Sequence, residues 1–517
     1  MSEQIATAWK LLPDYLLPHI ALSAAALALG IGIGLPLAVL AARRPMWRGP
    51  LLGLASLIQT IPGIALLAIF YPVLLALSSL TKPALGFDLP ALGFLPSVLA
   101  LSLYAILPVL RNGVTGLTGV DPAIREAAKG VGMTPRQSLL RVEAPLAAPV
   151  VMAGIRTSAV WTIGAATLAT PVGQTSLGNY IFTGLQIENW VYVAFGCVAS
   201  AALAIVVDRL LALIETGAER RDIRRIGAGL ALLALGTGLA VASGHRARAT
   251  YTLGAKNFSE QFILADLMAM QIEKAGATTA VREGLGSAVA FRALATGEID
   301  AYVDYTGTVW ANVLNRTDVP SREAMLAQLK TELHDKFGVT LLGALGFENA
   351  YALAMKKTRA ASLSLSDDAS LAQQASSLVF GADLEFLHRP EWARLQSVYG
   401  LRFRDTKAYD PTFMYRALSD GVVDVISAFT SDGRIAENDL VVLGDPKGAL
   451  PSYDAVILLA PKRAGDARLI EALRPLVGRI SVEAMRRANL AVDRDADKQT
   501  PGAAARALCA DVKLPKC

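Results

Sequence analysis

Between two long hydrophobic runs the sequence reads Arg125-Glu126-Ala127-Ala128-Lys129-Gly130-Val131-Gly132 and continues through Arg141-Val142-Glu143-Ala144-Pro145. The stretch is polar and rich in residues that favour helix. Gly132 frees the backbone in its middle, and Pro135 suits the first turn of a new helix. The pattern therefore predicts two short helices broken at Gly132, a stub that can dock into a groove on another protein.

The hydrophobic runs around this stretch indicate a membrane domain. Hydrophobic residues make up 53% of the 517 residues, too many for an ordinary soluble enzyme. A bilayer core needs about 20 apolar residues as helix. Six stretches have that length: residues 20–41, 54–77, 92–112, 149–169, 191–213 and 227–243. The sequence after about residue 250 reads instead as a water-soluble α/β domain.

The positions of lysine and arginine predict the orientation in the membrane. Basic residues follow the first, third and fifth runs, as at Arg43, Arg141 and Arg220. By the positive-inside rule the polar loop 121–146 is cytoplasmic, and the N-terminus and everything after the last run lie outside. The last run itself exports the C-terminal half, so we expect no cleavable signal peptide. The net charge of +5 reflects this topology, and we expect no nucleic-acid partner.

Two short segments inside the runs have local consequences. Gly30-Ile31-Gly32-Ile33-Gly34 carries spaced small residues, which favour close packing of helices. Gln59-Thr60-Ile61-Pro62-Gly63 interrupts the second run, either as a simple kink or as the lining of a pathway. The chain has no Gly-x-x-x-x-Gly-Lys-Ser/Thr loop for phosphate, so we expect any ATPase to be another polypeptide.

The C-terminal half alternates short aliphatic segments with helical ones from Tyr251 onward, which favours a parallel α/β sheet. It exceeds one compact core, so we expect lobe I at about 250–346 and 452–517, and lobe II at about 347–451. Cys509 and Cys517 lie in this exported half, where a disulfide between them is plausible. The four histidines show no metal-ligand spacing, and we expect no metal.

The polar loop resembles the EAA loop of ABC importer permeases. The matching positions are Glu126, Ala127, Ala128, Gly132, Val142 and Pro145, while Ala144 replaces the usual Leu. The resemblance implies a permease domain at 1–226, with 227–249 as an additional helix and linker. It also implies that the loop couples to a cytoplasmic ABC ATPase subunit, which binds ATP and Mg, so this chain needs no cofactor of its own. Importers of this kind have two permease subunits, which implies a homodimer of this chain, surrounded by lipid in a bacterial inner membrane.

The exported half, residues 250–517, resembles the binding proteins of glycine betaine, carnitine and choline importers. The motifs that carry the resemblance are Gly254–Gln261, Tyr305–Thr308, Phe347–Leu353, Pro411–Tyr415, Thr430–Arg434 and Gly448–Ala455. Together the two resemblances imply an all-α polytopic membrane domain followed by a two-lobed α/β binding domain on the periplasmic side.

In that family aromatic rings enclose the trimethylammonium head of the ligand. Carried over by motif, the cage consists of Tyr305, Tyr351, Tyr415 and Phe429, with Asn349 adding an oxygen. Phe429 departs from the tyrosine that is usual there. The partners of a ligand carboxylate correspond to Lys256, Thr308 and Arg389. Tyr302 precedes Tyr305 by two residues in an extended segment and is expected to serve packing alone.

These resemblances imply the membrane subunit of an ATP-driven importer for small quaternary-ammonium compounds, with no catalytic residues of its own. Ergothioneine, a betaine of a thiolated histidine, is an alternative cargo. A transmembrane ligand sensor is an alternative of another class, but it would need a cytoplasmic output domain, and the largest cytoplasmic segment is the polar loop.

Overall fold

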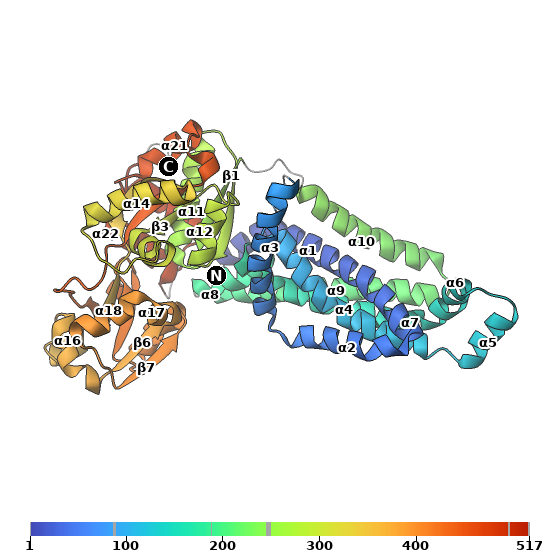
Figure 1. Cartoon of the computed structure of the whole chain (residues 1–517). Coiled ribbons are helices and arrows are strands. Elements are labelled where there is room, and N and C mark those ends of the chain that lie inside the picture. The colour runs from blue at the N-terminus through green and yellow to red at the C-terminus, as the bar shows by residue number, and fades with distance from the viewer. Residues whose placement is uncertain (1, 86–88, 188, 245–249, 495–496, 515–517) are drawn as a thin grey trace. The chain divides into compact units, whose positions relative to one another are not determined.

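The computed structural model describes residues 2–85, 89–187, 189–244, 250–494 and 497–514 (Figure 1). The chain forms two compact units. One holds Met1–Phe182 and Val191–Arg248, and the other holds Thr183–Trp190 and Ala249–Cys517. The first is helical and the second contains two β-sheets with helices, which confirms the predicted fold class.

The first unit is built from long apolar helices. They are α1 (Ser2–Arg43), α2 (Pro45–Thr60), α3 (Gly63–Leu85), α4 (Phe94–Thr118), α7 (Ala144–Ala166), α9 (Trp190–Glu219) and α10 (Ile223–Gly244). Within the described residues, five helical segments are long and apolar enough to cross a membrane, or six if α2 and α3 form one bent span. The six predicted runs fall on these elements.

The predicted second span, 54–77, is not one straight helix. Helix α2 ends at Thr60 and α3 begins at Gly63, with a bend of 100° between them. Ile61, which precedes Pro62, is extended with φ −71° and ψ 127°. A residue before proline is pushed out of the helical region, which explains why the break lies here.

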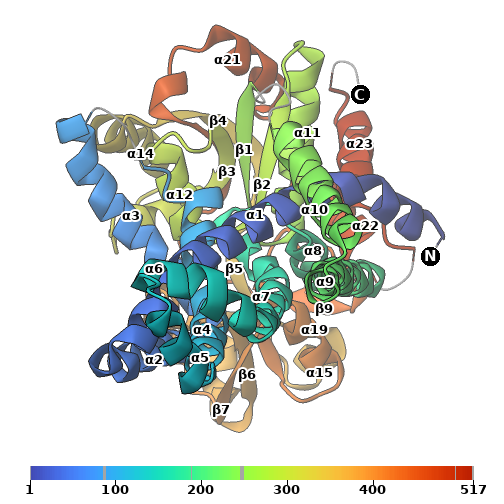
Figure 2. The ribbon, with the colours of Figure 1, turned by 90° about the vertical axis from the view of Figure 1, so that its right-hand side faces the viewer.

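Small residues set the contact between α1 and α4, which lie side by side (Figures 1 and 2). A Cβ atom on Gly30 would lie 2.5 Å from the Cβ of Ala105, and one on Gly34 would lie 3.0 Å from Val109 Cγ1. A side chain at Gly30 would force the two backbones apart, so the packing role predicted for the glycine segment is confirmed.

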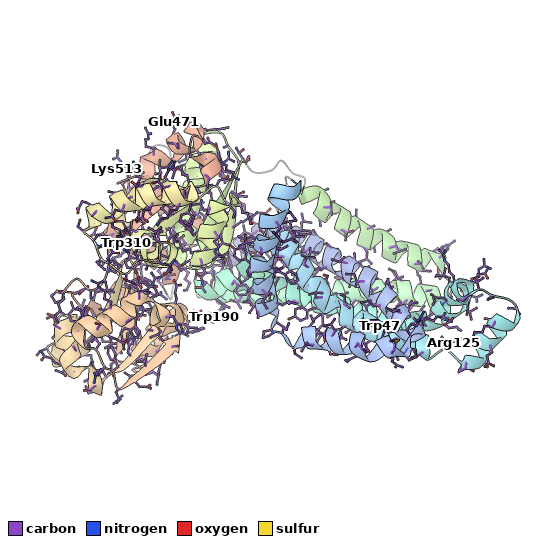
Figure 3. All side chains as sticks on the ribbon, viewed as in Figure 1. Trp47, Arg125, Trp190, Trp310, Glu471 and Lys513 are labelled. Carbon is purple, nitrogen blue, oxygen red and sulfur yellow. The ribbon has the colours of Figure 1, made fainter. Side chains whose placement is uncertain are left out.

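The polar loop forms α5 (Pro122–Gly130), which carries Arg125 (Figure 3), followed by a second helix from Pro135. The break falls at Gly132 as predicted, with φ at +78°. The second helix is not short, however. Helix α6 (Pro135–Ser138) passes through a π-helical turn at Leu139–Glu143 directly into α7. Pro145 has no N–H to donate, and the wider turn before it lets the helix continue.

The second unit has two five-stranded sheets. The first has the order β2-β1-β3-β10-β4, from β1 (Tyr251–Lys256), β2 (Thr279–Leu285), β3 (Ala301–Tyr305), β4 (Thr340–Glu348) and β10 (Asp454–Leu459). The second has the order β7-β6-β8-β5-β9, from β5 (Tyr351–Lys356), β6 (Val379–Asp383), β7 (Asp405–Tyr409), β8 (Val425–Phe429) and β9 (Leu440–Val442). Helix α11 (Ser259–Lys274) lies along β1 and β2 (Figure 2).

Neither sheet is purely parallel, which corrects the sequence prediction. Strand β10 runs antiparallel to β3 and β4, and β5 runs antiparallel to β8 and β9. Strands β5 and β10 each begin just after the chain has passed from one sheet to the other. They therefore run away from the edge at which the chain crosses, whereas β3 and β8 run toward that edge. The ends of the outgoing strands and the starts of β5 and β10 therefore meet at one edge of each sheet.

Candidate functional site

A cavity of about 520 Å³ lies at the edges where the two sheets face each other. Seven of the eight residues predicted to contact a ligand line it. They are Lys256, Tyr305, Thr308, Asn349, Tyr351, Arg389 and Phe429. The fold brings them together because Lys256 ends β1, Tyr305 ends β3 and Phe429 ends β8, while Tyr351 begins β5. Lys256 and Phe429, which are 173 positions apart in the sequence, thus share one surface.

Five aromatic rings form a continuous group at the cavity. The ring centroids of Tyr351 and Phe429 lie 4.8 Å apart, and those of Tyr351 and Tyr453 lie 5.6 Å apart. Phe258 connects the two sides, at 6.1 Å from Tyr305 and 6.5 Å from Phe429. Phe258 and Tyr453 were not predicted as site residues, although both fall inside motifs that carried the family resemblance.

Tyr415 is the predicted ring that does not line the cavity. It lies in α19 (Pro411–Ser419), and its ring is covered by the guanidinium of Arg434, 4.0 Å from the ring centroid. Arg434 itself lines the cavity and pairs with Asp432 at 2.8 Å. Tyr415 therefore supports the cavity wall from behind. The motif placed it close to the site but could not show which side chain lies in front.

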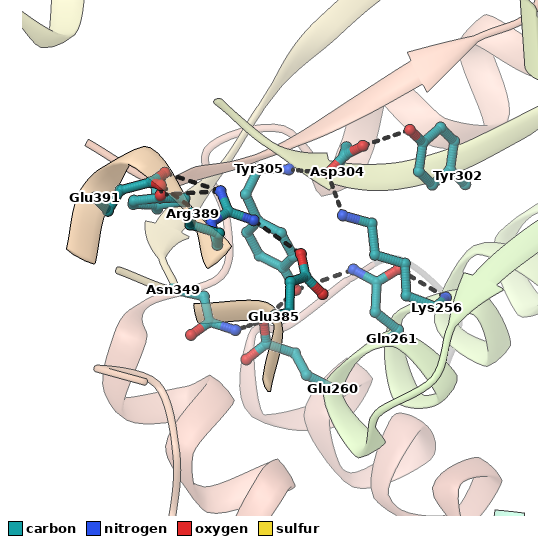
Figure 4. Close-up of polar contacts among 11 residues, drawn as sticks. Lys256, Glu260, Gln261, Tyr302, Asp304, Tyr305, Asn349, Glu385, Arg389 and Glu391 are labelled. Carbon is teal, nitrogen blue, oxygen red and sulfur yellow. Dashed lines mark hydrogen bonds and ion pairs between the residues drawn. The ribbon is translucent and has the colours of Figure 1, made fainter. Parts of the chain in front are cut away.

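Lys256 is paired within the protein. Its Nζ forms an ion pair with Asp304, and both side chains are buried (Figure 4). The hydroxyl of Tyr302 donates to the other oxygen of the same carboxylate, so this residue does more than the packing expected of it. The charge of Lys256 is thus compensated before any ligand is considered.

Arg389 is paired in the same way. Its Nη2 lies 2.9 Å from Glu391 Oε1 and its Nη1 lies 2.9 Å from Glu385 Oε1. Nη2 also donates to the hydroxyl of Tyr453 at 3.2 Å. Lys256 and Arg389 were predicted to contact the carboxylate of a ligand, and each has a carboxylate partner within the protein. Glu385 and Glu391 lie four and two residues from Arg389 in the sequence, whereas Asp304 lies 48 residues from Lys256.

Glu260 is a buried carboxylate at the cavity, near the start of α11 (Figure 4). Tyr305 donates its hydroxyl to Oε1 at 2.6 Å, and Asn349 donates its amide to the same oxygen at 3.1 Å. Asn489, in α22 (Val482–Asp493), donates to Oε2 at 2.8 Å. Burial raises the pKa of Glu260, and these hydrogen bonds only partly oppose that shift.

The described cavity lining carries more negative than positive groups. Its cations are Lys256, Arg389 and Arg434. Its carboxylates are Glu260, Asp383, Glu385, Asp410, Asp432 and Asp493. Burial raises the pKa of Asp493 to about 6, against the influence of Arg434, so this group is largely ionised at neutral pH. Three cations against six carboxylates make the cavity more hospitable to a positive ligand than to a negative one.

Most of the residues predicted to couple to an ATPase are exposed. These are Glu126 and Ala127 on α5, Gly132 after it, and Pro145 at the start of α7. Ala128 is buried. Two apolar side chains beside them are also exposed, Val131 at 74% and Leu140 at 59%. Glu143 is buried among them. It accepts from Arg43 at 2.6 Å and from Ser138 at 2.9 Å, and lies 3.5 Å from Arg125.

Two other predictions concern metals and a disulfide. Over the described ranges, no three His, Cys, Asp or Glu side chains are grouped so as to hold a metal ion. Cys509 is buried in α23 (Pro501–Asp511), 3.6 Å from the amide of Gln271. Cys517, its predicted partner, lies outside the described residues.

Each of the two units matches a known protein family. Residues 249–511 match the substrate-binding domain of ABC-type glycine betaine transport systems, and residues 30–220 match the inner membrane component of binding-protein-dependent transport systems. The ergothioneine transport permease and binding protein EgtU of Helicobacter pylori (strain G27) is 28% identical over 466 residues, covering 86% of this chain and 81% of the relative.

Other similarities cover one unit each. The choline transport system permease protein OpuBB of Bacillus subtilis (strain 168) is 42% identical over 197 residues, which is 38% of this chain and 83% of OpuBB. A crystal structure of a glycine betaine/carnitine/choline ABC transporter covers 51% of this chain and 99% of its own, with 25% identity and a TM-score of 0.46. The chain therefore belongs to the family of substrate-binding domains of ABC-type glycine betaine transport systems, joined in one polypeptide to an inner-membrane permease domain of the binding-protein-dependent type.

Proposed function

We propose that this chain is the membrane subunit, with its own capture domain, of an ATP-driven importer for small quaternary-ammonium compounds of the glycine betaine, carnitine and choline class. The observation that carries the proposal is the cavity itself, where five aromatic rings adjoin a lining with twice as many carboxylates as cations. Relatives that transport choline, carnitine and glycine betaine support the same ligand class.

The chemistry of the cavity suits a quaternary ammonium. Such a group has no N–H to donate, so hydrogen-bonding side chains cannot distinguish it from other groups of its size. Ring faces attract it electrostatically, at roughly 0.5–2 kcal/mol for each well-placed ring. Tyr305, Tyr351 and Phe429 contribute such faces, and Phe258 and Tyr453 extend them. Thr308 and Arg389 remain the proposed contacts for the carboxylate of a betaine, with Arg389 shared between ligand and Glu391.

Transport against a gradient requires energy from elsewhere. We assign ATP and Mg to a separate cytoplasmic ATPase subunit, which docks on α5 and the exposed residues around Gly132. The exposed side chains of Val131 and Leu140 suit contact with an apolar groove. We assign this loop to the cytoplasmic side and the binding domain to the periplasm, and the placement of Lys and Arg supports that orientation. Two copies of the chain in the lipid bilayer would complete one pathway.

Titration calorimetry on the full chain in lipid nanodiscs tests the ligand class. The panel is glycine betaine, carnitine, choline, proline betaine and ergothioneine, with glutamate as a ligand of the opposite charge. The expected result is saturable binding of at least one quaternary ammonium, with one site per chain, and none of glutamate. Failure of all five compounds to bind a protein that is monodisperse would contradict the proposal.

Ergothioneine is the second candidate cargo. The relative EgtU has the same fused arrangement and aligns with 86% of this chain. Phe429 also differs from the tyrosine usual in the betaine-binding family, which leaves the wall at β8 less polar. In the calorimetric panel, binding of ergothioneine at least tenfold tighter than every other compound would favour this cargo.

A further inference from the structure

Glu260 is notable because its surroundings stabilise a negative charge without neutralising it. Tyr305, Asn349 and Asn489 all donate hydrogen bonds to it, and none of them is a cation. Lys256, Arg389 and Arg434 each pair with another carboxylate instead. Among the described residues, Glu260 forms no ion pair. These donors favour the ionised form of Glu260 and offset part of the cost of burying its charge, and a cationic ligand beside it would offset more.

The amides around Glu260 leave further acceptor atoms at the same place. The Oδ1 atoms of Asn349 and Asn489 are buried, and neither has a hydrogen-bond partner within the described residues. Both side chains line the cavity, as Glu260 does. An acceptor oxygen buried without a donor is unfavourable, and a positive ligand beside it offsets that cost. The carboxylate of Glu260 and the two amide oxygens thus lie at one part of the cavity, and among the described residues no cation forms an ion pair or hydrogen bond with them.

The aromatic group begins directly at this carboxylate. Tyr305 donates its hydroxyl to Glu260 and its ring stacks with Phe258, at 6.1 Å between centroids. A cation held against these rings would therefore lie within a few ångströms of Glu260. In contrast, Lys256 lies 5.3 Å from the Tyr305 centroid but is already neutralised by Asp304.

We propose that Glu260 is the counter-ion of the ligand's cationic head group, so that the site selects its ligand by charge as well as by aromatic contact. The inference rests on the proposed function and adds to it. Ring faces attract a trimethylammonium and also pack against a neutral tert-butyl group of the same shape. An ionised carboxylate discriminates between the two, because only the first has a charge to pair with.

Choline and 3,3-dimethylbutan-1-ol provide the test, because the alcohol is the uncharged carbon analogue of choline. Both are titrated into the full chain in nanodiscs, as the parent and as Glu260→Gln. Glutamine has nearly the same shape, and Asn489 can rotate its amide to accept from the new NH2, since its Oδ1 has no partner among the described residues. The expected result is that Glu260→Gln weakens choline by about 10- to 100-fold, as expected for unit charges about 6 Å apart at an effective dielectric constant near 20.

The neutral analogue serves as the internal control. Its affinity should change by less than about threefold in Glu260→Gln, because no charge pairing is lost. Glu471→Gln is the matched control variant, since Glu471 is an exposed glutamate on α21 (Ala467–Leu473), away from the cavity (Figure 3). It removes the same charge from the surface and should leave both affinities as in the parent.

The possible outcomes separate the inference from the proposed function. If the parent binds choline and Glu260→Gln keeps the parent's preference for choline over the alcohol, Glu260 is not the counter-ion although the function stands. If the parent binds no quaternary ammonium, the proposed function itself fails. If Glu260→Gln binds neither compound, Glu260→Asp decides: a retained preference for choline supports the counter-ion role, and a lost preference overturns it.

Discussion

The ring of Phe429 is the predicted cage member at which this sequence departs from its family. It lies 4.8 Å from the Tyr351 ring and 6.5 Å from the Phe258 ring. Phe429→Ala removes a wall of the aromatic group, so choline binding should weaken by about 10- to 30-fold. Phe429→Tyr keeps the ring face and should change the affinity by less than about tenfold. Calorimetric titration of both variants checks this.

Phe413→Ala is the matched control for the Phe429 variants. Phe413 is also a phenylalanine of the second sheet's helices, but it is exposed and does not line the described cavity. Its removal should leave choline binding unchanged. Equal affinity of the parent and Phe429→Ala would show that the ring of Phe429 does not contact the ligand. Loss of binding in Phe429→Tyr would instead indicate a cargo that needs the space left by the missing hydroxyl.

A second prediction at this scale concerns stability and pH. Burial raises the pKa of Glu260 above its value in the unfolded chain, so the protonated form stabilises the fold and that contribution is lost as pH rises through the folded pKa. At pH 8, Glu260→Gln should therefore raise the apparent melting temperature of the ligand-free chain, by roughly 2–4 °C for each kcal/mol gained. At pH 4 the parent glutamate is protonated and the difference should disappear.

Scanning fluorimetry at both pH values measures this effect, with Glu471→Gln as the control. Choline at pH 8 should then raise the melting temperature of the parent more than that of Glu260→Gln, because only the parent gains a charge pair. A variant less stable than the parent at pH 8 would show that the carboxylate is needed for folding and is not held at a cost for binding.

The sequence predicted which residues meet at the cavity better than how they are paired. Seven of the eight site residues predicted from family motifs line the cavity, because a motif fixes the position of a residue on the fold. The ion pair of Lys256 with Asp304 depends on β1 lying beside β3, a long-range contact that no motif contains. For the same reason the donors converging on Glu260 from β3, the crossing segment and α22 could not be seen before the structure.

At the scale of elements, the break after α5 gives a prediction about coupling. Gly132 has φ +78°, and no atom lies within 4 Å of where its Cβ would be. A substitution there meets backbone strain rather than a clash. Gly132→Asp should reduce cellular choline uptake severely, because it adds strain and a negative charge to the docking surface, while choline binding by the purified chain stays unchanged. Normal uptake by Gly132→Asp would contradict the docking role.

Gly132→Asn is the matched variant for that experiment. Asparagine tolerates positive φ better than other side chains and adds no charge. It should therefore retain more uptake than Gly132→Asp at equal expression. Equal loss in both variants would show that the added negative charge is not the cause of the loss.

Glu143 fixes the same loop from its other end. Its buried carboxylate joins Arg43 of α1, Arg125 of α5 and Ser138 of α6. Glu143→Ala would leave two cations without their acceptor and release α5, so uptake should fall at least several-fold while choline binding is preserved. Glu219→Gln, an exposed glutamate at the end of α9, is the control and should transport normally. Normal uptake by Glu143→Ala would show that α5 is held by other contacts.

Elements were predicted well where hydropathy alone sets them. The apolar runs fall on helices, but only the structure shows that Pro62 divides the second run by a bend of 100°. Strand and helix alternation predicted the α/β class. It could not show that β5 and β10 run antiparallel, since strand direction depends on which sheet the chain has just left.

At the scale of the whole molecule, the fusion gives every permease domain its own capture domain. The homodimer that we propose would therefore carry two tethered binding domains for one pathway. A short tether holds each binding domain near the permease at an effective concentration on the order of millimolar. Docking of the binding domain is then favoured even when its affinity for the permease is weak. One working capture domain should then suffice to supply the pathway.

Mixed dimers test this proposal. Chains with two different affinity tags are expressed together, one intact and one carrying Phe429→Ala, and complexes holding both tags are isolated in sequence. Recovery of complexes with both tags is expected if the chain pairs with itself, and failure to recover them in mild detergent would contradict the homodimer.

In cells that express both alleles, choline uptake should remain at about half the parent level or more, because the intact domain rebinds its permease rapidly. Cells with Phe429→Ala in both copies should show much lower uptake at limiting choline. Uptake of only about one quarter of the parent level, which is the share of intact homodimers when two equally expressed alleles pair at random, would mean that both capture domains must be loaded together. Tethering would then serve cooperation between the two sites rather than local supply.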